Sequence, residues 1–367
     1  MNLYLPILVV AAALAASQAP NRPPAAVSFD QIAKRAAEAR QRDQLEEAIK
    51  LYRQAVRLRP SYDEGWWYLS TILYDLDRYE EARETLRRFI SLRPKAGPGW
   101  AMLGLCEFEL REYERSLQHL MKGQSLGFGD FQQLRYVARY HLELLLTRFE
   151  RFEEGSLILA ALVLEGKESP AIIEALGLNV LRMPYLPSEL PSDKRELVLK
   201  AGRATYDALV HRTEEAYRGY QELVGRYPQE PNVHYAFGVF LLKDHSEEAL
   251  REFRREIELF PNHVAARLQI ALEYIKRGQF DPALPFAEEA VKLAPRDFAA
   301  RRTLGRILLV KGDTVRAVQE LEAAVKLAPG NPETHYALAT AYERVGRKED
   351  AQRERAEFAR LGKEEPK

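Results

Sequence analysis

Few residues in this sequence have the types and spacing that chemistry requires. The stretch "GQSLG", residues 123–127, has the G-x-S-x-G spacing of a nucleophile elbow. Such an elbow works because a sharp strand-to-helix turn holds the serine hydroxyl beside an oxyanion hole. Here the stretch falls at the end of an expected helix with no expected strand near it. We therefore interpret the match as a coincidence of spacing.

The histidines and the cysteine form no metal-binding or catalytic pattern either. No two of the seven histidines have the spacing of a metal site, and Cys106 is the only cysteine. A catalytic thiol needs a neighbouring base, and none can be identified for Cys106. Glutamate pairs in "YEEA", "TEEA" and "SEEA" lie at expected helix N-termini, where the helix dipole favours anions. We predict no catalytic residue, no metal, no cofactor and no enzymatic activity.

The composition indicates an all-α protein that does not bind nucleic acid. Lys and Arg together number 54, and Asp and Glu also number 54, so the formal net charge is zero. Binding to phosphates needs a surplus of cations on some surface, which this balance does not favour. Helix formers such as Ala, Leu, Glu and Arg dominate, and no stretch alternates in the manner of a half-buried strand.

The N-terminus is apolar from Leu3 to Ala16 and carries no charged side chain before Arg22. This run is shorter than the roughly 20 residues that span a bilayer. It is typical of a secretory signal peptide, with cleavage after Ala16 or Ala19. We therefore expect a periplasmic or secreted protein. The alternative is an uncleaved segment that anchors the protein to the inner membrane.

A repeated phrase organises most of the chain. Phrases such as "AVRLRP", "FISLRP", "EIELFP" and "AVKLAP" each end in proline. These prolines follow one another at intervals of 33 or 34 residues on either side of a central gap, and they are Pro60, Pro94, Pro228, Pro261, Pro295 and Pro329. A fixed period of this length is typical of a repeat protein, in which neighbouring units stack and bury a continuous core.

The repeat resembles the 34-residue unit of the tetratricopeptide repeat family. In the unit that begins at Asp63, the residues that match the family's signature are Trp66, Leu69, Tyr79, Ala82 and Pro94. The recognisable units begin at Phe29, Asp63, Gly97, Leu197, Glu230, Val264, Phe298 and Pro332. The unit from Glu230 is one residue short in its turn. The resemblance implies an all-α superhelix (an α-solenoid) of about eight recognisable units with an irregular, proline-interrupted centre.

Five segments are predicted along the chain. They are a signal peptide (1–19), a linker (20–28), an N-terminal repeat segment (29–128), a degenerate helical centre (129–196) and a C-terminal repeat segment with a capping helix (197–367). The centre holds one further helix pair, one further helix in "PAIIEALGLNVLRM", and a break at "PYLPSELPSD".

The two adjacent tryptophans differ in their expected roles, because neighbours on a helix point about 100° apart. Trp66 is at the fourth position of its unit, which packs between helices. Trp67 is at the fifth position. In the family that this sequence resembles, the fifth, ninth and twelfth positions line a concave groove for peptides or helices. The candidate groove residues are Trp67, Thr71, Tyr74, Leu105, Phe108, Tyr235, Leu268, Leu272, Arg302, Arg306 and Tyr336. The alternative is that these side chains fill the superhelix internally.

The function that we expect is a non-enzymatic scaffold that binds a protein or peptide partner in an apolar groove. Arg302 and Arg306 are available for an acidic residue of that partner. Two alternatives stay open: an accessory subunit of an envelope enzyme or secretion complex, and an enzyme or glycan-binding solenoid that uses the irregular centre. We expect no nucleic acid, no small-molecule cofactor, and membrane contact only through an uncleaved N-terminus.

The export hypothesis predicts a shortened, soluble mature protein. Mass spectrometry of the protein from its native cells should find a first residue between positions 17 and 20, because signal peptidase cuts after small residues. An intact Met1 on cytosolic protein would contradict export. An intact Met1 on membrane-bound protein would favour the anchor.

Overall fold

The computed structural model describes residues 28–364, and in this range the chain forms α-helices and one short 3-10 helix without any strand. The all-α fold built of repeated helix pairs is therefore confirmed. The predicted signal peptide and all but the last residue of the predicted linker lie outside the described residues. None of the helices in residues 28–364 combines the length and apolar character that a bilayer crossing requires.

Residues 28–364 contain nine consecutive helix pairs, of which eight are the recognisable units. The first helices are α1 (Phe29–Gln41), α3 (Asp63–Asp75), α5 (Gly97–Glu109), α7 (Gln132–Arg148), α10 (Arg195–Leu209), α12 (Val233–Leu241), α14 (Val264–Lys276), α16 (Phe298–Lys311) and α18 (Pro332–Arg344). The second helices are α2 (Leu45–Leu58), α4 (Tyr79–Leu92), α6 (Tyr113–Leu126), α8 (Phe152–Leu164), α11 (Thr213–Arg226), α13 (Ser246–Leu259), α15 (Phe280–Leu293), α17 (Thr314–Leu327) and α19 (Lys348–Glu364).

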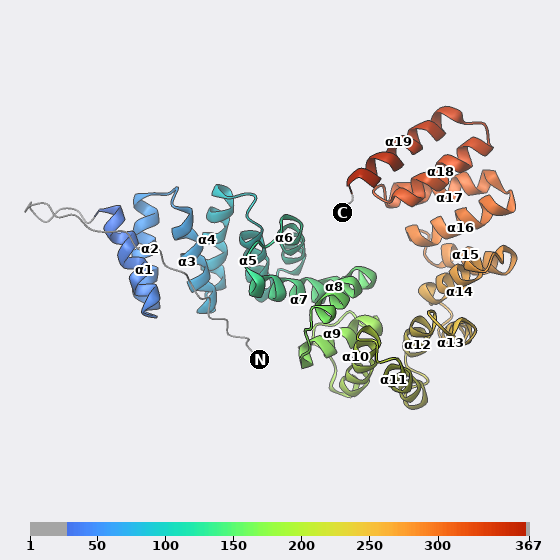
Figure 1. The fold of residues 1–367 in the computed structure, drawn as a ribbon, viewed down its shortest axis with the longest axis horizontal. Helices are drawn as coiled ribbons and strands as arrows, with labels where there is room; N and C mark the ends of the chain where they lie inside the picture. The colour runs from blue at the N-terminus through green and yellow to red at the C-terminus, as the bar shows by residue number, and fades with distance from the viewer. Residues whose placement is uncertain (1–27, 365–367) are drawn as a thin grey trace, which may run out of the picture. The chain divides into compact units, whose positions relative to one another are not determined.

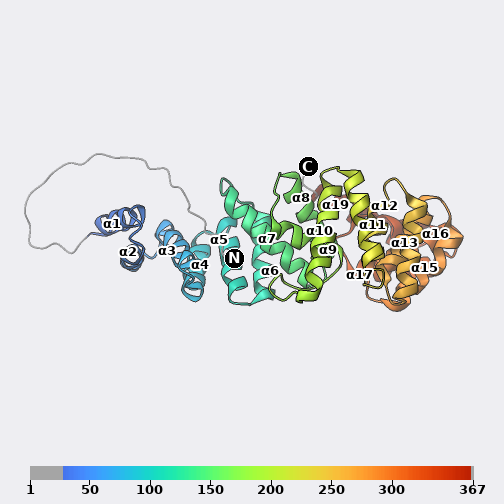
Figure 2. The same ribbon diagram turned by 90° about the horizontal axis from the view of Figure 1, so that it is seen from below.

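Outside the pairs lie only α9 (Pro170–Val180) and the 3-10 helix η1 (Ser192–Lys194) among the described elements. Paired helices such as α10 and α11, or α12 and α13, lie side by side in both views (Figure 1, Figure 2). The chain forms two compact units. Unit 1 holds the residues up to Ala175 together with Met183–Leu190, and unit 2 holds Leu176–Arg182 and the residues from Pro191 onward. The predicted five-part division stays a prediction.

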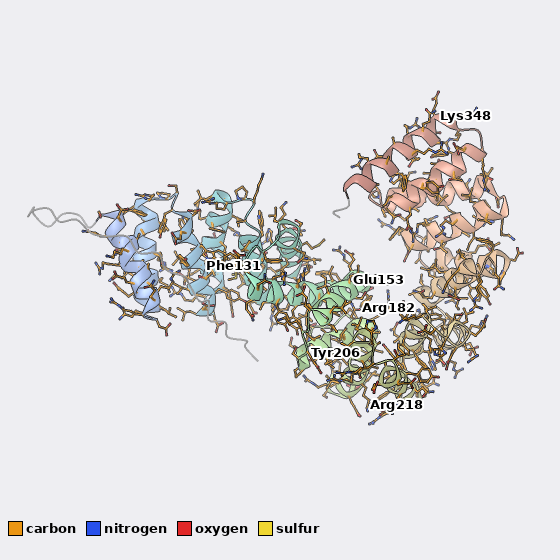
Figure 3. The ribbon with its side chains drawn as sticks, viewed as in Figure 1. Phe131, Glu153, Arg182, Tyr206, Arg218 and Lys348 are labelled. Atoms are coloured by element: carbon orange, nitrogen blue, oxygen red, sulfur yellow. The ribbon has the colours of Figure 1, made fainter. Side chains whose placement is uncertain are left out.

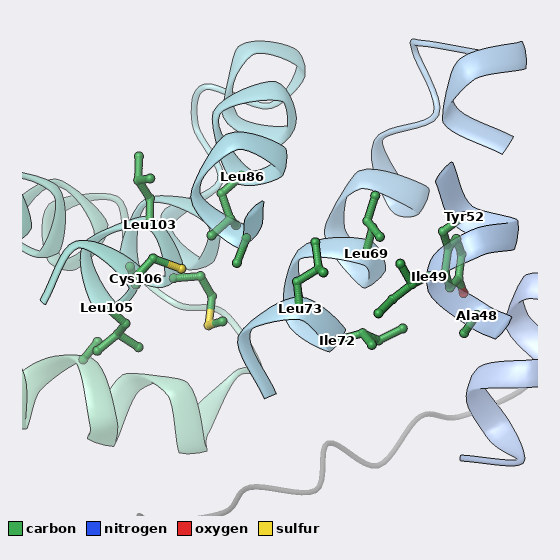
Figure 4. Packing of buried hydrophobic residues seen from close by; sticks show 14 of the residues in the cluster. Ala48, Ile49, Tyr52, Leu69, Ile72, Leu73, Leu86, Leu103, Leu105 and Cys106 are labelled. Atoms are coloured by element: carbon green, nitrogen blue, oxygen red, sulfur yellow. The ribbon is translucent and has the colours of Figure 1, made fainter. Parts of the chain in front are cut away.

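Small residues allow the two helices of a pair to approach closely, and large ones fill the space between pairs. Ala82 and Leu86 of α4 are fully buried, as are their equivalents Ala317 and Leu321 of α17. Gly104 shows how close the approach is, because a Cβ atom there would lie 2.7 Å from a side-chain carbon of Leu120. Figure 4 shows how leucine, isoleucine and tyrosine side chains meet in the core of unit 1. Because these side chains are buried between neighbouring pairs, a single helix pair is not stable alone and stability comes from the stack.

In eight of the nine pairs the turn between the two helices contains a residue with left-handed backbone. Glycine holds this position in only three of the pairs. In chain order the residues with positive φ are Asp43, Asp77, Arg111, Glu150, His211, Gly278, Gly312 and Gly346. The other side chains cost roughly 1–2 kcal/mol each in this conformation, and packing of the flanking helices offsets that cost. The pair α12 and α13 lacks such a residue because α12 has only nine residues.

The irregular centre contains the helices that the sequence predicts. The pair α7 and α8 and the single helix α9 correspond to the apolar stretches that continue at helical spacing. The proline loop that follows is held by specific contacts rather than by helical hydrogen bonds. Leu186 is buried, and its backbone N–H donates to Glu189 Oε2 at 3.1 Å. Arg148 of α7 pairs with the same carboxylate at 2.5 Å. The loop is thereby fixed within unit 1.

First helices of neighbouring pairs contact one another directly within each unit. In unit 1 α5 contacts α7, and in unit 2 α14 contacts α16, which in turn contacts α18. Successive first helices can touch only if the stack curves toward the side on which they lie. The first helices therefore line the inner, concave side of each unit, and their fifth, ninth and twelfth positions decide what that side presents.

Two compact units should unfold in more than one step, because the helix pairs of a solenoid depend on their neighbours. We expect circular dichroism to show two transitions on heating the whole protein. Leu176–Arg182 belongs to unit 2, where a Cβ on Gly177 would lie only 1.9 Å from the carbonyl oxygen of Val198. A fragment of residues 176–367 should therefore melt above a fragment of residues 192–367. A single transition of the whole protein that coincides by two probes would contradict this division.

Candidate functional site

The fourth residue of a first helix donates a hydrogen bond to the proline that closes the preceding unit. Trp66 Nε1 donates to the carbonyl oxygen of Pro60 at 2.9 Å, and Trp100 Nε1 donates to that of Pro94 at 2.9 Å. Arg301 repeats the arrangement with the carbonyl oxygen of its own preceding proline at 2.6 Å. Trp66 also packs against the core of unit 1. Trp66 therefore links its own helix pair to the helix pair before it.

Two histidines at the same position have the same partner. The Nε2 atom of His234 lies 3.2 Å from the carbonyl oxygen of Pro228, and that of His335 lies 2.8 Å from the carbonyl oxygen of Pro329. The Nδ1 atoms face glutamates of the second helices, Glu252 at 2.6 Å and Glu354 at 2.5 Å. Both rings are buried, as expected for a packing position. The sequence signal for this joint is a nitrogen-bearing side chain six residues after each repeat proline, and sequence analysis did not use it.

The fifth-position residue Trp67 is covered by another part of the chain. Its ring lies 5.2 Å from Phe89 and 5.5 Å from Phe131, the residue just before α7 (Figure 3). Two other candidates in unit 1, Thr71 and Leu105, are buried at 7% and 2% exposure. The structure brings these residues together along α3 and α5. It offers little of their surface to a partner.

The twelfth-position aromatic residues of unit 1 are also in contact with their own chain. Tyr74 is half-buried with its ring 5.4 Å from Tyr79, and Phe108 lies 4.7 Å from the ring of His141. Burial lowers the pKa of His141, and its Nδ1 lies 2.8 Å from the carbonyl oxygen of Val137. A neutral ring packed against Phe108 fills the concave side here. In unit 1 the arrangement agrees with internal filling.

Unit 2 presents a more open concave side. Tyr235 and Leu268 are buried at 7% and 9% exposure, while Leu272 is half-buried. Tyr336 is 58% exposed, and its ring touches Phe358 of α19 at 5.5 Å. Val239, another fifth-to-twelfth stripe residue, is 39% exposed. Apolar surface therefore reaches the solvent along α12, α14 and α18.

The two candidate arginines on α16 differ in their contacts. Arg302 pairs with Glu333 of α18 at 2.5 Å, and its Nε atom is buried without a hydrogen-bond partner. Arg306 is exposed and forms no ion pair with any residue between 28 and 364. One turn of helix separates the two guanidinium groups along the same face. Arg306 is the cation that is left for an external anion.

Buried titratable groups elsewhere serve packing rather than catalysis. Burial raises the pKa of the Cys106 thiol, so it is not a ready nucleophile. Burial also raises the pKa of Glu143 to about 8, and this carboxyl accepts a hydrogen bond from Thr147 Oγ1 at 2.8 Å. Ser125 of "GQSLG" lies within α6, where its hydroxyl donates to the carbonyl oxygen of Lys122. Residues 28–364 hold no group of three or more potential ligands that could bind a metal.

His263 shows how burial and capping act together. Its Nδ1 accepts a hydrogen bond from the backbone N–H of Ala266 at 3.0 Å, which caps the N-terminus of α14. Its Nε2 lies 2.8 Å from the side-chain oxygen of Asn232. Burial, with a further contribution from nearby Arg182, lowers the pKa of His263 to about 4. The ring is a neutral cap at physiological pH, and sequence analysis assigned it no role.

Comparison with known proteins agrees with this geometry. Models of the tetratricopeptide repeat match residues 33–99, 73–122 and 268–332, and a second model of the same repeat matches residues 308–357. Residues 33–122 and 268–357 are therefore similar to tetratricopeptide repeats. The matched stretches leave residues 123–267 unmatched, which include the irregular centre and the units from Leu197 and Glu230. No curated protein matches the sequence.

Several solved structures share the helix-pair arrangement over less than half of this chain. MamA 41-end from Desulfovibrio magneticus RS-1 is 22% identical with a TM-score of 0.42, and the match covers 47% of this chain and 98% of that one. MamA AMB-1 is 21% identical with a TM-score of 0.40, and the match covers 45% of this chain and 98% of that one. Likeness at this level carries no information about function.

The contact between Trp67 and Phe131 predicts an energetic coupling. In a double-mutant cycle, Trp67→Ala and Phe131→Ala should couple by about 0.5–1.5 kcal/mol in the free energy of unfolding, as aromatic pairs do. The matched control is the neighbouring tryptophan: Trp66→Ala combined with Phe131→Ala should be additive. Urea unfolding monitored by circular dichroism measures the free energy of unfolding of the wild type, the two single variants and the double variant in each cycle. A Trp67–Phe131 coupling of zero would mean that the aromatic side chains of unit 1 are not held together and that this groove is open.

Proposed function

We propose that this protein is a non-enzymatic scaffold that binds a segment of a partner protein on the concave side of unit 2. The observation that carries the proposal is the exposed, unpaired guanidinium of Arg306 among apolar side chains at equivalent repeat positions. Val239, Leu272 and Arg306 lie on α12, α14 and α16, each eleven residues after the preceding repeat proline. Tyr336, the fifth-position residue of α18, extends the surface.

The chemistry of this surface defines the partner segment. An exposed tyrosine ring and half-buried aliphatic side chains suit an amphipathic helix or an extended apolar peptide. Arg306 then suits an aspartate or glutamate of that peptide, because a carboxylate can bind a guanidinium through two hydrogen bonds. Arg302 has less to offer, since Glu333 already holds it. We therefore propose a partner that alternates apolar residues with at least one acidic residue.

The same reasoning favours unit 2 over unit 1 as the binding surface. In unit 1 the groove positions are buried or covered by Phe131 and His141. Tyrosine and arginine are enriched among residues that dominate binding energy, and both are exposed in unit 2. The proposed location is the periplasm or the cell exterior, and this rests on residues 1–19, which lie outside the described part of the chain.

A peptide-display selection tests the proposed function. Immobilised full-length protein should enrich peptides with apolar residues and an acidic residue from a random library of peptides about 12 residues long, a length that can follow such a groove. Arg306→Glu and Tyr336→Ala should each weaken a selected peptide roughly tenfold or more, the range of a binding hot spot. Lys326→Ala, which changes an exposed residue of the second helix α17, is the control and should bind as the wild type does. Equal selection by Arg306→Glu would contradict the proposal.

A further inference from the structure

The one-residue deletion in the unit from Glu230 creates a cavity at the turn side of unit 2. The depression has a volume of about 350 Å³ and lies between the turn that joins α10 to α11 and the end of α12. Its lining combines the ends of α10 and α12 with the start of α11 and the two turns, and it includes none of the candidate groove residues. A volume at the small end of ligand sites suits one side chain rather than a folded element.

Aromatic rings form one wall of this cavity. Tyr217 of α11 lies 6.5 Å from Phe240 of α12 and 5.9 Å from the ring of His245, measured between ring centroids. The hydroxyl of Tyr217 donates to Glu248 at 3.1 Å, which fixes the orientation of its ring. Rings held in this way present π faces, which attract an organic cation such as a guanidinium.

The acids of the cavity form no ion pair with any described residue, whereas some of the residues at equivalent positions do. In some other units the second residue of the second helix pairs with a cation of the next turn. Glu46 pairs with Arg78 at 3.3 Å, and Glu247 pairs with Arg277. The equivalent of Glu46 and Glu247 at this cavity is Glu214. It forms no ion pair within residues 28–364.

A third ion pair shows which position usually supplies the cation. Asp281 pairs with Lys311, which is 30 residues later, and the same interval separates Glu247 from Arg277. Thirty residues after Glu214 the chain has a second acid, Asp244. Lys243, its neighbour, forms no ion pair in the described chain. Asp244 thus holds the position of Arg277 and Lys311, and the two carboxylates at the rim lack the cation that those turns supply.

We infer that this cavity binds the guanidinium of an arginine side chain from a partner polypeptide. The two carboxylates of Glu214 and Asp244 supply the anions, and Tyr217 and Phe240 supply the aromatic faces. The guest takes the place that Arg78 and Arg277 take in their own turns. Lys243, His211 and His245 are the other titratable groups that face the cavity, and Lys243 opposes a cationic guest. This site shares no residue with the proposed binding surface on the concave side. The inference therefore stands even if the proposed function is contradicted.

The test uses a minimal probe and its neutral isostere. Acetyl-Ala-Arg-Ala-amide is titrated into the full-length protein labelled with carbon-13 at the histidine rings, and nuclear magnetic resonance follows the signals. The arginine peptide should shift the His211 and His245 signals saturably, with a dissociation constant in the millimolar range. The citrulline analogue, which lacks the charge, should not. No saturable shift, or the same shift with citrulline, would overturn the inference.

Variants distinguish a guanidinium site from an anion site. Glu214→Gln combined with Asp244→Asn should weaken binding roughly fivefold to tenfold, whereas the control Glu349→Gln, an exposed acid at the equivalent position of α19, should leave it unchanged. Lys243→Ala should tighten binding, and weaker binding would indicate an anion site and overturn the inference. Asp244→Arg should abolish binding without lowering the melting temperature, because the new guanidinium occupies the cavity. Unchanged binding in Asp244→Arg would also overturn it.

Discussion

The structure depends on a hydrogen bond that joins a residue near the start of a first helix to the repeat proline before it, and five of the six repeat prolines accept one. A repeat proline cannot continue its own helix, and its carbonyl oxygen is left without a helical donor. A nitrogen-bearing side chain six residues later supplies that donor for five of the six repeat prolines, whereas Arg267, six residues after Pro261, donates to the carbonyl oxygen of His263. Because the bond spans the boundary between units, it fixes where the next first helix begins. All the surfaces built on the first helices follow from that placement.

The residue type that donates this hydrogen bond varies between repeats, but the donor is always a side-chain N–H group. Tryptophan, arginine and histidine have little in common except an N–H group at the end of a large side chain. Each of them fills space between helices and also donates one hydrogen bond. The next residue along the helix does not form this hydrogen bond, because its side chain points about 100° away. Trp66 and Trp67 illustrate the division, because the first joins two units and the second meets Phe89 and Phe131 on the concave side.

The two units use their concave sides differently although the repeat is the same. In unit 1 the aromatic residues at groove positions meet aromatic residues from one or two pairs further along, such as Phe131 and His141. In unit 2 the equivalent positions include Val239 and Tyr336, which are exposed. Filling a groove with the chain's own side chains stabilises the fold but removes a binding surface. Under the proposed function, unit 2 supplies the binding surface and the filled side of unit 1 supports the fold.

The period of the prolines was sufficient to predict the helix pairs, the units and the packing role of Trp66, because these depend on local spacing. The burial of Leu105 and the cover over Trp67 could not be predicted in the same way. Phe131 is distant from Trp67 in sequence, and their contact depends on how tightly successive pairs coil. Left-handed Asp77 and Arg111 were also missed, since packing of the flanking helices overrides the local preference for glycine.

The most direct measurement is the stability of variants that lose the N–H group and keep an aromatic ring. Trp66→Phe and Trp100→Phe each remove the donor to a proline carbonyl while a large apolar side chain stays in place. Denaturant unfolding should show that each variant loses about 1 kcal/mol, the usual net value of one hydrogen bond, and that the two losses add. If both variants are as stable as the wild type, ring packing alone positions the helices, and the hydrogen bond between units does not hold the stack together.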